Sequence, residues 1–298
     1  MLYRAGFLGD ILVTNAAVRA IRRRWKSHNI VYQCWPQFVS ALIADPNVNQ
    51  VVPVTQYDYG GERFLDFRHE AFEDEWDKTY WGELLYRQAL EAGLAGPPDG
   101  TFRPHVYFRE QDIATKDEGT KLCLLHGWSA NGRNWRLWPY ERWGELAEQL
   151  AADGWTVAQV GVPNDPPMDN VMDLRGATKD IMGLYGLFAV ADLVICIDSA
   201  MQHIAVADKF VRFPDGKTEK VSGPTPCVLL NGPMNSKCIV AEDSKTVVVS
   251  NYAGCGNGGP CNHSFGTGEL PICEWDNACI VDISVNMVME AVSVSRSK

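Results

Sequence analysis

Long hydrophobic runs are missing from this 298-residue sequence. No apolar stretch approaches the roughly 18 residues that a membrane-spanning helix needs, so we expect at most peripheral contact with a membrane. Basic residues are also fewer than acidic ones: the sequence has 27 Lys and Arg and 37 Asp and Glu, a net charge of -10. That balance argues against a nucleic-acid-binding protein, whose affinity comes largely from neutralising phosphates. The first residues show no charged start followed by a long apolar stretch, so we expect no secretory signal and a cytoplasmic protein.

Short-period repeats and low-complexity tracts are absent too, and the mean hydropathy of -0.17 with 46% hydrophobic residues is typical of a globular protein. Apolar runs alternate between strand-like and helix-like patterns in two successive series. The polar, proline-rich stretch from residue 97 to about 119 is the best boundary between them. The sequence therefore predicts an α/β protein with two parallel-sheet domains facing a cleft, over residues 1–115 and 116–298. Residues 208–223 interrupt the second series and predict a hairpin insert.

The first motif is a glycine turn followed by an aspartate. Gly6 and Gly9 permit a tight turn, and apolar residues at helical spacing follow Asp10. This order places Asp10 at the carboxyl edge of a sheet, where open α/β folds bind ligands. The alternative is that Asp10 only caps the helix. The helix then carries five cations, which either attract an acidic glycan or lipid headgroup or, as we expect, form a solvated face. They are Arg19, Arg22, Arg23, Arg24 and Lys26.

A polar loop in the second half carries candidate anion ligands. Ser129, Arg133 and Arg136 lie between a predicted strand at 121–127 and a predicted helix at 140–154. Arginine suits a diphosphate because its guanidinium offers a fork of donors. The alternative is that these arginines are solvated loop charges.

The segment "ICIDSAMQHIAVA" is a more specific signal. A buried strand ends in Asp198, and a helix then starts with small residues and free N–H groups at Ser199, Ala200, Met201 and Gln202. Backbone donors and the helix dipole at such a start favour an anion. His203, in the first turn, is either part of this site or a packed, hydrogen-bonded core residue. The next predicted strand likewise leads into a possible ligand-binding turn, at Gly232.

The nine cysteines divide into two groups. Five lie in or beside apolar runs and are predicted to be buried thiols: Cys34, Cys123, Cys196, Cys227 and Cys238. The other four, Cys255, Cys261, Cys273 and Cys279, form a C-x5-C-x11-C-x5-C cluster. In a cytosolic protein we expect such a cluster to hold a structural zinc or iron, with His263 as a substitute ligand. Disulfides or free thiols are the alternatives.

Four motifs in a fixed order resemble glycosyltransferase family 9, the ADP-heptose:lipopolysaccharide heptosyltransferases and their relatives. They are Gly9-Asp10, Arg136-Leu137-Trp138-Pro139 with Trp143, Asp198-Ser199-Ala200-Met201-Gln202-His203, and Asn231-Gly232-Pro233. Two positions depart from the family pattern: Arg136 stands where the family has lysine, and Ala200 stands where it has glycine. The resemblance extends through most of the chain, and some relatives carry a similar C-terminal four-cysteine metal site.

The resemblance implies a GT-B fold of two Rossmann-like domains, with the Cys-rich segment 255–279 at the end of the second. It implies inverting transfer of a heptose or related sugar from a nucleotide-diphosphate donor, most simply an ADP-sugar, without a catalytic metal. The acceptor would be a glycan, a lipopolysaccharide-type molecule or a protein, with Asp10 as general base and no role for nucleic acid. Gly9 and the polar residues of the second half, including Ser129, Arg136 and Ser199 to Gln202, would bind the donor. The alternatives are a GT-B nucleotide-sugar epimerase and a non-catalytic sugar-nucleotide or glycan-binding relative.

Overall fold

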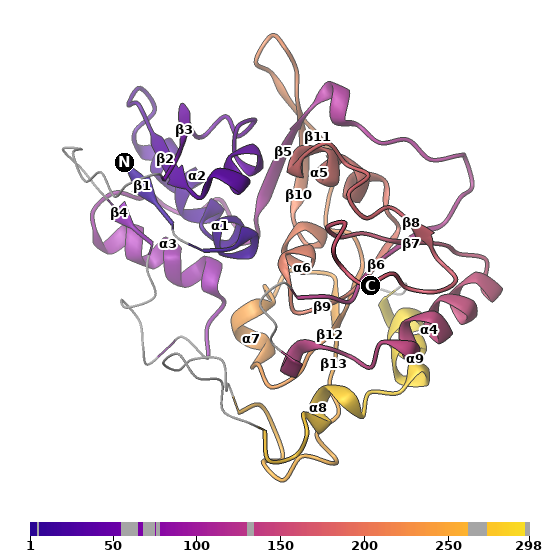
Figure 1. The fold of residues 1–298 in the computed structure, drawn as a ribbon. Helices are drawn as coiled ribbons and strands as arrows, with labels where there is room; N and C mark the ends of the chain where they lie inside the picture. The colour runs from indigo at the N-terminus through magenta and orange to yellow at the C-terminus, as the bar shows by residue number, and fades with distance from the viewer. Residues whose placement is uncertain are drawn as a thin grey trace.

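The structure is a computed structural model that describes residues 1–4, 6–54, 65–67, 75, 78–129, 134–261 and 273–295. Figure 1 shows two parallel sheets with their helices, joined by long connections. This arrangement confirms the α/β class and the alternation of strands and helices that the sequence predicts. Within the described residues, no helix is long and apolar enough to cross a membrane.

The first sheet has the strand order β3-β2-β1-β4 and is parallel throughout. The predicted helix after Asp10 is interrupted at Thr14, whose hydroxyl bonds to Ile11 O at 2.7 Å. The apolar stretch 38–44 lies mostly in the short 3₁₀ helix η1, which begins at Pro36. The elements are β1 (Leu2–Tyr3), α1 (Leu8–Val13), α2 (Asn15–Arg24), β2 (Val31–Cys34), η1 (Pro36–Ala41), β3 (Gln50–Pro53), β4 (Leu65–Asp66) and α3 (Trp81–Glu91).

The second sheet has the order β13-β12-β9-β6-β7-β8 and is also parallel. Its three central strands, β12, β9 and β6, are buried at every position, as expected for strands covered by helices on both faces. The strands are β6 (Leu122–His126), β7 (Thr156–Gln159), β8 (Met172–Asp173), β9 (Leu193–Ile197), β12 (Cys227–Leu230) and β13 (Thr246–Val249). The helices are η4 (Asn134–Arg136), α4 (Glu141–Ala152), α5 (Ile181–Val190), α6 (Ala200–Ala205), α7 (Ser236–Ile239), α8 (Ala278–Val281) and α9 (Val285–Ser295).

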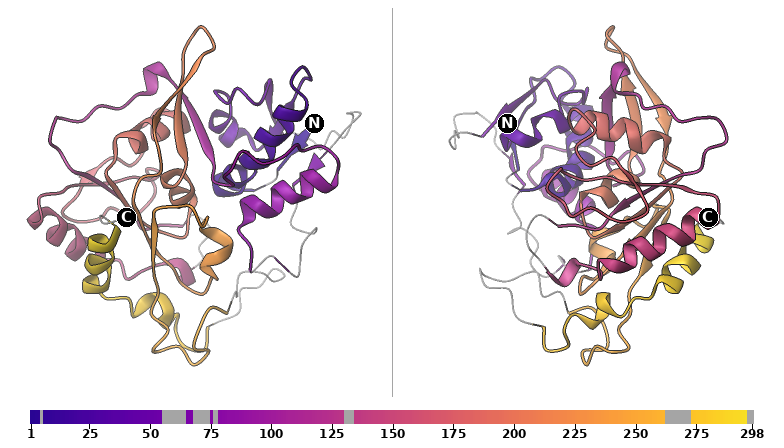
Figure 2. Two further views of the ribbon diagram at one scale, coloured as in Figure 1. Left: turned by 180° about the vertical axis from the view of Figure 1, so that it is seen from behind. Right: turned by 45° about the vertical axis from the view of Figure 1, so that its right-hand side comes forward.

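Alternate residues of the second sheet pack against different helices because successive side chains of a strand point to opposite faces. Leu125 and Ile195 join the core formed with α4 and α9, which lie side by side in Figure 2. Leu124 and Val194 join the core formed with α5 and α6. That second core continues into the first sheet, so the face carrying α5 and α6 packs against the N-terminal half.

A small third sheet contains a strand that the sequence does not predict. The expected hairpin insert is present as β10 (Asp208–Arg212) and β11 (Thr218–Ser222), with Gly216 at a φ of +85° in its turn. Strand β5 (His105–Arg109), followed by the short η3 (Glu110–Asp112), pairs in parallel with β10. It lies within the polar stretch that the sequence suggests as a boundary, and it connects the two halves of the chain.

Candidate active site

Asp10 is the third residue of α1, directly after the turn at Gly6 and Phe7. One carboxylate oxygen accepts from the Phe7 N–H at 2.8 Å, which is the capping contact expected at this position. The other accepts from Arg4 Nη2, also at 2.8 Å. Arg4 is 1% exposed and Asp10 is 24% exposed, so a buried cation fixes a carboxylate that remains open to solvent. The capping bond is therefore present, and a buried cation holds the same carboxylate in place.

The Gly9–Asp10 turn lies against α6 of the second sheet. A Cβ atom at Gly9 would stand 3.2 Å from His203 Cδ2 and 3.7 Å from the Ala200 Cα, which explains why glycine occupies this position. Burial lowers the pKa of His203 to about 4, while the charges of Asp198 and Asp10 oppose that change. Helix α1 contacts α6, so the carboxylates of Asp10 and Asp198 both lie close enough to His203 to affect its pKa.

Arg136 and Asp198 form a largely buried pair beside this contact. Nη2 of Arg136 lies 3.1 Å from Asp198 Oδ2, and Nη1 donates to the Asp198 carbonyl at 3.2 Å. The guanidinium carbon also stands 4.6 Å from the Trp135 ring centre, within range of a cation–π contact. Solvated loop charge, the alternative interpretation, is therefore wrong for Arg136. Arg133 lies outside the described residues.

The turn from Ser199 to Gln202 differs from the expectation in one respect. The Met201 N–H bonds to Ser199 Oγ at 3.4 Å, and the Gln202 N–H bonds to the Ser199 carbonyl at 3.2 Å. The prediction of free N–H groups is therefore wrong for Met201 and Gln202, because the serine caps its own helix. Ser199 Oγ also lies 3.2 Å from His126 Nδ1.

Several buried polar atoms around this turn have no hydrogen-bond partner in the part of the chain that the structure describes. They are Arg136 Nε, Gln202 Nε2, His203 Nδ1 and Asn231 Oδ1. An unpaired buried polar group costs about 1–3 kcal/mol, so such atoms in one place are expected where a polar ligand binds.

Other motif residues have structural roles. Trp138 and Trp143 are buried, with their rings 5.0 Å apart at 90°, and Trp138 Nε1 donates to the Ile283 carbonyl at 2.8 Å. A Cβ atom at Gly232 would stand 2.5 Å from the Trp135 carbonyl, so only glycine lets these two loops approach. Ser129, the third residue after β6, is buried.

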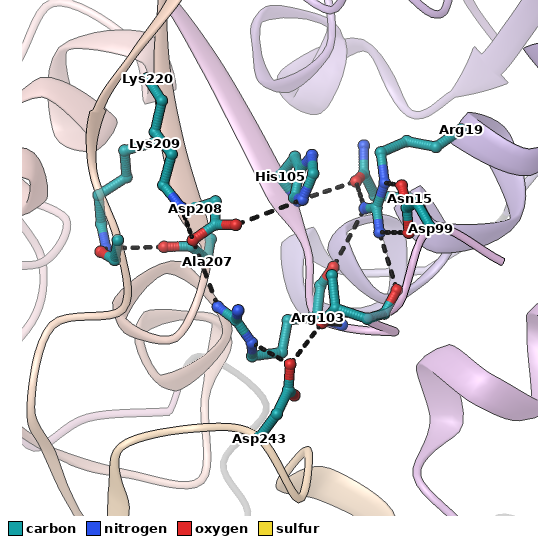
Figure 3. A network of polar contacts seen from close by, with 12 residues as sticks. Asn15, Arg19, Asp99, Arg103, His105, Ala207, Asp208, Lys209, Lys220 and Asp243 are labelled. Atoms are coloured by element: carbon teal, nitrogen blue, oxygen red, sulfur yellow. Dashed lines mark hydrogen bonds and ion pairs between the residues drawn. The ribbon is translucent and has the colours of Figure 1, made fainter. Parts of the chain in front are cut away.

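The cations of α2 bind their own chain (Figure 3). Arg19, which is buried, donates to both carboxylate oxygens of Asp99 at 2.7 and 3.1 Å and to the carbonyls of Thr101 and Arg103 at 3.0 and 3.1 Å. Arg23 also bonds to Asp99, at 2.8 Å, and Arg22 donates to the carbonyls of Asn47 and His28. The solvated face that the sequence predicts is therefore wrong for Arg19, which is buried, whereas Arg22 and Arg23 stay partly exposed while they bond to other groups of the chain.

The same network continues to α6. Arg103 bonds to Asp243 at 2.7 Å and to the Val206 carbonyl at 3.0 Å (Figure 3). Lys209 is completely buried, and its Nζ donates to the carbonyls of Ala205 and Ala207, both at 2.9 Å. The carboxyl end of α6 is thus held by charged side chains.

None of the nine cysteines, all of which the structure describes, forms a disulfide, and the first group of five is buried, as predicted. In the second group, Cys255 and Cys279 are buried whereas Cys261 and Cys273 are half-buried. Burial raises the pKa of Cys279 to about 12, and the charges of the other three thiols add to this rise, so the four belong to one neighbourhood. Among the described residues, no group of three or more Cys, His, Asp or Glu is placed to hold a metal ion. The metal site stays a prediction, and His263 lies outside the described residues.

Part of the chain matches a known protein family. Residues 102–209 match the model of glycosyltransferase family 9 (heptosyltransferase). A search of curated proteins returned no match. The resemblance to family 9 that the sequence predicts is confirmed for residues 102–209, and the two-sheet fold is that of GT-B heptosyltransferase structures.

Solved structures with the same fold include three heptosyltransferase-type proteins. A family 9 glycosyl transferase from Veillonella parvula is 14% identical, with a TM-score of 0.72 over 99% of this chain and 95% of the other. ADP-heptose lps heptosyltransferase II from E. coli is 16% identical, with a TM-score of 0.70 over 99% and 98%. The dodecameric iron-containing heptosyltransferase TibC, in complex with ADP-D-beta-D-heptose, is 14% identical, with a TM-score of 0.72 over 99% and 75%.

Sequence reasoning missed three buried residues beside the predicted ones: Arg4, His126 and Asp165. Arg4 and His126 lie at or directly after the carboxyl end of a parallel strand, and Asp165 lies in the loop that follows β7; this position is the one signal in the sequence that points to them.

Proposed function

We propose that this protein moves a heptose or related sugar, with inversion, from a nucleotide-diphosphate donor to a glycan, a lipopolysaccharide-type molecule or a protein. The observation that carries the proposal is the contact of the Gly9–Asp10 turn with α6. It sets a solvent-accessible carboxylate against the Arg136–Asp198 pair and a set of unpartnered buried polar atoms. ADP in the structure of E. coli heptosyltransferase WaaC and ADP-heptose in that of TibC support an ADP-sugar as the donor here.

Residues 1–115 would bind the acceptor. Asp10 would accept the proton of the attacking hydroxyl, since its carboxylate is accessible to solvent and is held in one orientation by Arg4 and Phe7. Two exposed aromatic side chains follow adjacent parallel strands at the same sheet edge: Phe7 is 55% exposed and Trp35 is 48% exposed. Large apolar surfaces exposed next to a base favour contact with a ring of the acceptor.

Residues 116–298 would bind the donor. The departing diphosphate gains negative charge in the transition state, and a fixed cation in a water-poor site stabilises that charge best. Arg136 fits this role because it is 15% exposed and its Nε has no partner among the described residues. The remaining proposed donor ligands are Gly9, Ser129, Arg133, Asp198, Ser199, Ala200, Met201, Gln202, His203 and Gly232.

We further propose a structural zinc or iron at Cys255, Cys261, Cys273 and Cys279. The other three thiols raise the pKa of Cys279, which requires them to be near it, and this supports the donor set. The iron named for TibC supports it as well. Four thiolates suit a tetrahedral structural site, which would stabilise a segment rich in Gly, Pro and Asn. Catalysis would then require no metal. We propose a cytoplasmic location, where thiols remain reduced.

A donor screen followed by single-residue substitution tests the transfer reaction. ADP-sugars, with UDP- and GDP-sugars for comparison, would be incubated with glycan acceptors, and release of nucleoside diphosphate would be measured. Asp10→Asn keeps an acceptor for Arg4 but removes the base, so we expect turnover to fall about 100-fold or more with donor affinity nearly unchanged. Asp215→Asn, in the exposed hairpin turn, is the matched control. Parent-level turnover by Asp10→Asn would show that Asp10 is only a helix cap.

A further inference from the structure

Three polar residues at or after the ends of three adjacent strands of the second sheet lie in a row. Strand β6 lies between β7 and β9, and its last residue is His126. Asp165 follows β7, and Ser199 follows β9 by two residues. The row therefore leads from the loop after β7 to the first residue of the proposed donor-binding turn.

The contacts within this row are directional. Nδ1 of His126 lies 3.2 Å from Ser199 Oγ, and Nε2 lies 3.8 Å from Asp165 Oδ2. His126 is 8% exposed and Asp165 is 6% exposed. The Asp165 carboxylate is itself held by the Val162 N–H at 3.0 Å. Burial lowers the pKa of His126 to about 4, so the imidazole is neutral near pH 7.

A neutral imidazole carries one N–H and one acceptor nitrogen. The carboxylate facing Nε2 favours the proton on that nitrogen, which leaves Nδ1 as the acceptor. The Ser199 hydroxyl then donates to His126, while its oxygen accepts from the Met201 N–H. The proton and one of the two lone pairs of the Ser199 hydroxyl are thereby assigned before a ligand arrives.

We infer that His126 and Asp165 are positioning residues that fix the Ser199 hydroxyl and, through it, the first turn of α6 for the donor's diphosphate. The inference rests on the proposed function. A turn held in its binding conformation loses less freedom when the ligand binds, so affinity rises without a direct contact from the histidine. Ser199 acts here as a hydrogen-bond donor to His126, so its proton points away from the ligand.

Two substitutions separate the nitrogens of the imidazole. His126→Asn places an amide near the position of Nδ1 and keeps a partner for Ser199, whereas His126→Gln places it near Nε2 and removes that partner. Calorimetry with ADP should show His126→Asn within about 2-fold of the parent. A net hydrogen bond is worth about a 2- to 12-fold change in affinity, so His126→Gln and Ser199→Ala should each weaken ADP binding about 5-fold.

A double-substitution cycle then tests whether the histidine acts through the serine. With Ser199→Ala already present, His126→Gln should cause no further loss of ADP affinity. His28→Gln, at an exposed position, is the matched control and should leave ADP affinity unchanged. Thermal unfolding of each variant confirms that it is folded at the temperature of the titration.

Additive losses in the cycle, or equal losses for His126→Asn and His126→Gln, would overturn the positioning role while leaving the donor site intact. Unchanged ADP affinity in Ser199→Ala would also overturn it. A folded parent protein that binds none of ADP, UDP or GDP would instead refute the proposed function, and this inference with it.

Discussion

Replacing Arg19 by Met should destabilise the protein by about 3 kcal/mol. Arg19 is buried and holds the segment that leads from α3 to β5, through Asp99 and the carbonyls of Thr101 and Arg103 (Figure 3). Burial raises the pKa of Asp99, but the bond and charge of Arg19 outweigh it and lower this pKa to about 2. The pair is therefore strongly coupled in the folded state.

The magnitude follows from burial. Removing one partner of a buried ion pair costs about 3–5 kcal/mol, because the other partner stays buried without compensation. Asp99 is 26% exposed and keeps its bond to Arg23, so the lower end of that range applies. Met preserves the apolar stem of Arg19, and the loss is thus assigned to the guanidinium.

Arg23→Met is the matched control, since it lies on the same helix and bonds to the same carboxylate at 2.8 Å. Arg23 is 36% exposed, and exposed pairs contribute about 0–1 kcal/mol. Urea unfolding followed by circular dichroism gives the two free energies of unfolding. Equal losses for the two variants, or a loss below about 1 kcal/mol for Arg19→Met, would refute the assignment of the stability to the buried pair.

Three further predictions concern the donor site, the cysteines and pH. Arg136→Met should weaken ADP binding about 10-fold by calorimetry, because it removes a charged donor, and unchanged affinity together with unchanged turnover would contradict its role. Cys273→Ser should release about one equivalent of zinc or iron by elemental analysis and lower stability more than turnover; a parent protein with far less than one equivalent would remove the site. Acidification from pH 7 to 5 should lower the free energy of unfolding by about 2 kcal/mol through His203 alone. The pKa of His203 is about 4 in the folded protein and about 6.5 in the unfolded chain, so unfolding takes up a proton in this pH range. The stability that the neutral His203 contributes is complete above pH 6.5 and falls as the pH decreases toward 4. In urea unfolding at pH 7 and pH 5, His203→Gln should therefore lose about 2 kcal/mol less stability on acidification than the parent protein.

Local patterns in the sequence determined the main architecture. The apolar runs that became β6, β9 and β12 are continuous, which predicts strands buried on both faces. The hairpin at 208–223 follows from Pro214-Asp215-Gly216, whose turn needs the positive φ of Gly216. The glycine turn before Asp10 and the strand end at Asp198 were likewise readable, because both signals lie within a few neighbouring residues.

Strand β5 was not predicted because its stability comes from a partner about 100 residues away. His105–Arg109 stands in a polar, proline-rich stretch and gains its order by pairing with β10. Propensity alone does not select a strand there, since what stabilises a strand is the neighbour against which it packs.

Only the tertiary structure determined which partners the charged side chains bind. A run of arginines on a helix predicts a solvated face, yet Arg19 and Arg23 both bind Asp99, which is 80 and 76 positions away. Arg4 and His126 show no motif in the sequence. Arg4 bonds to Asp10, six residues further on, across the turn after β1, whereas His126 meets Ser199 only when the ends of β6 and β9 come together. Local sequence determines the hydrophobic periodicity and the residues of the turns. Which polar groups pair depends instead on which distant residues the packed sheets bring within about 3 Å of each other, and the whole fold decides this.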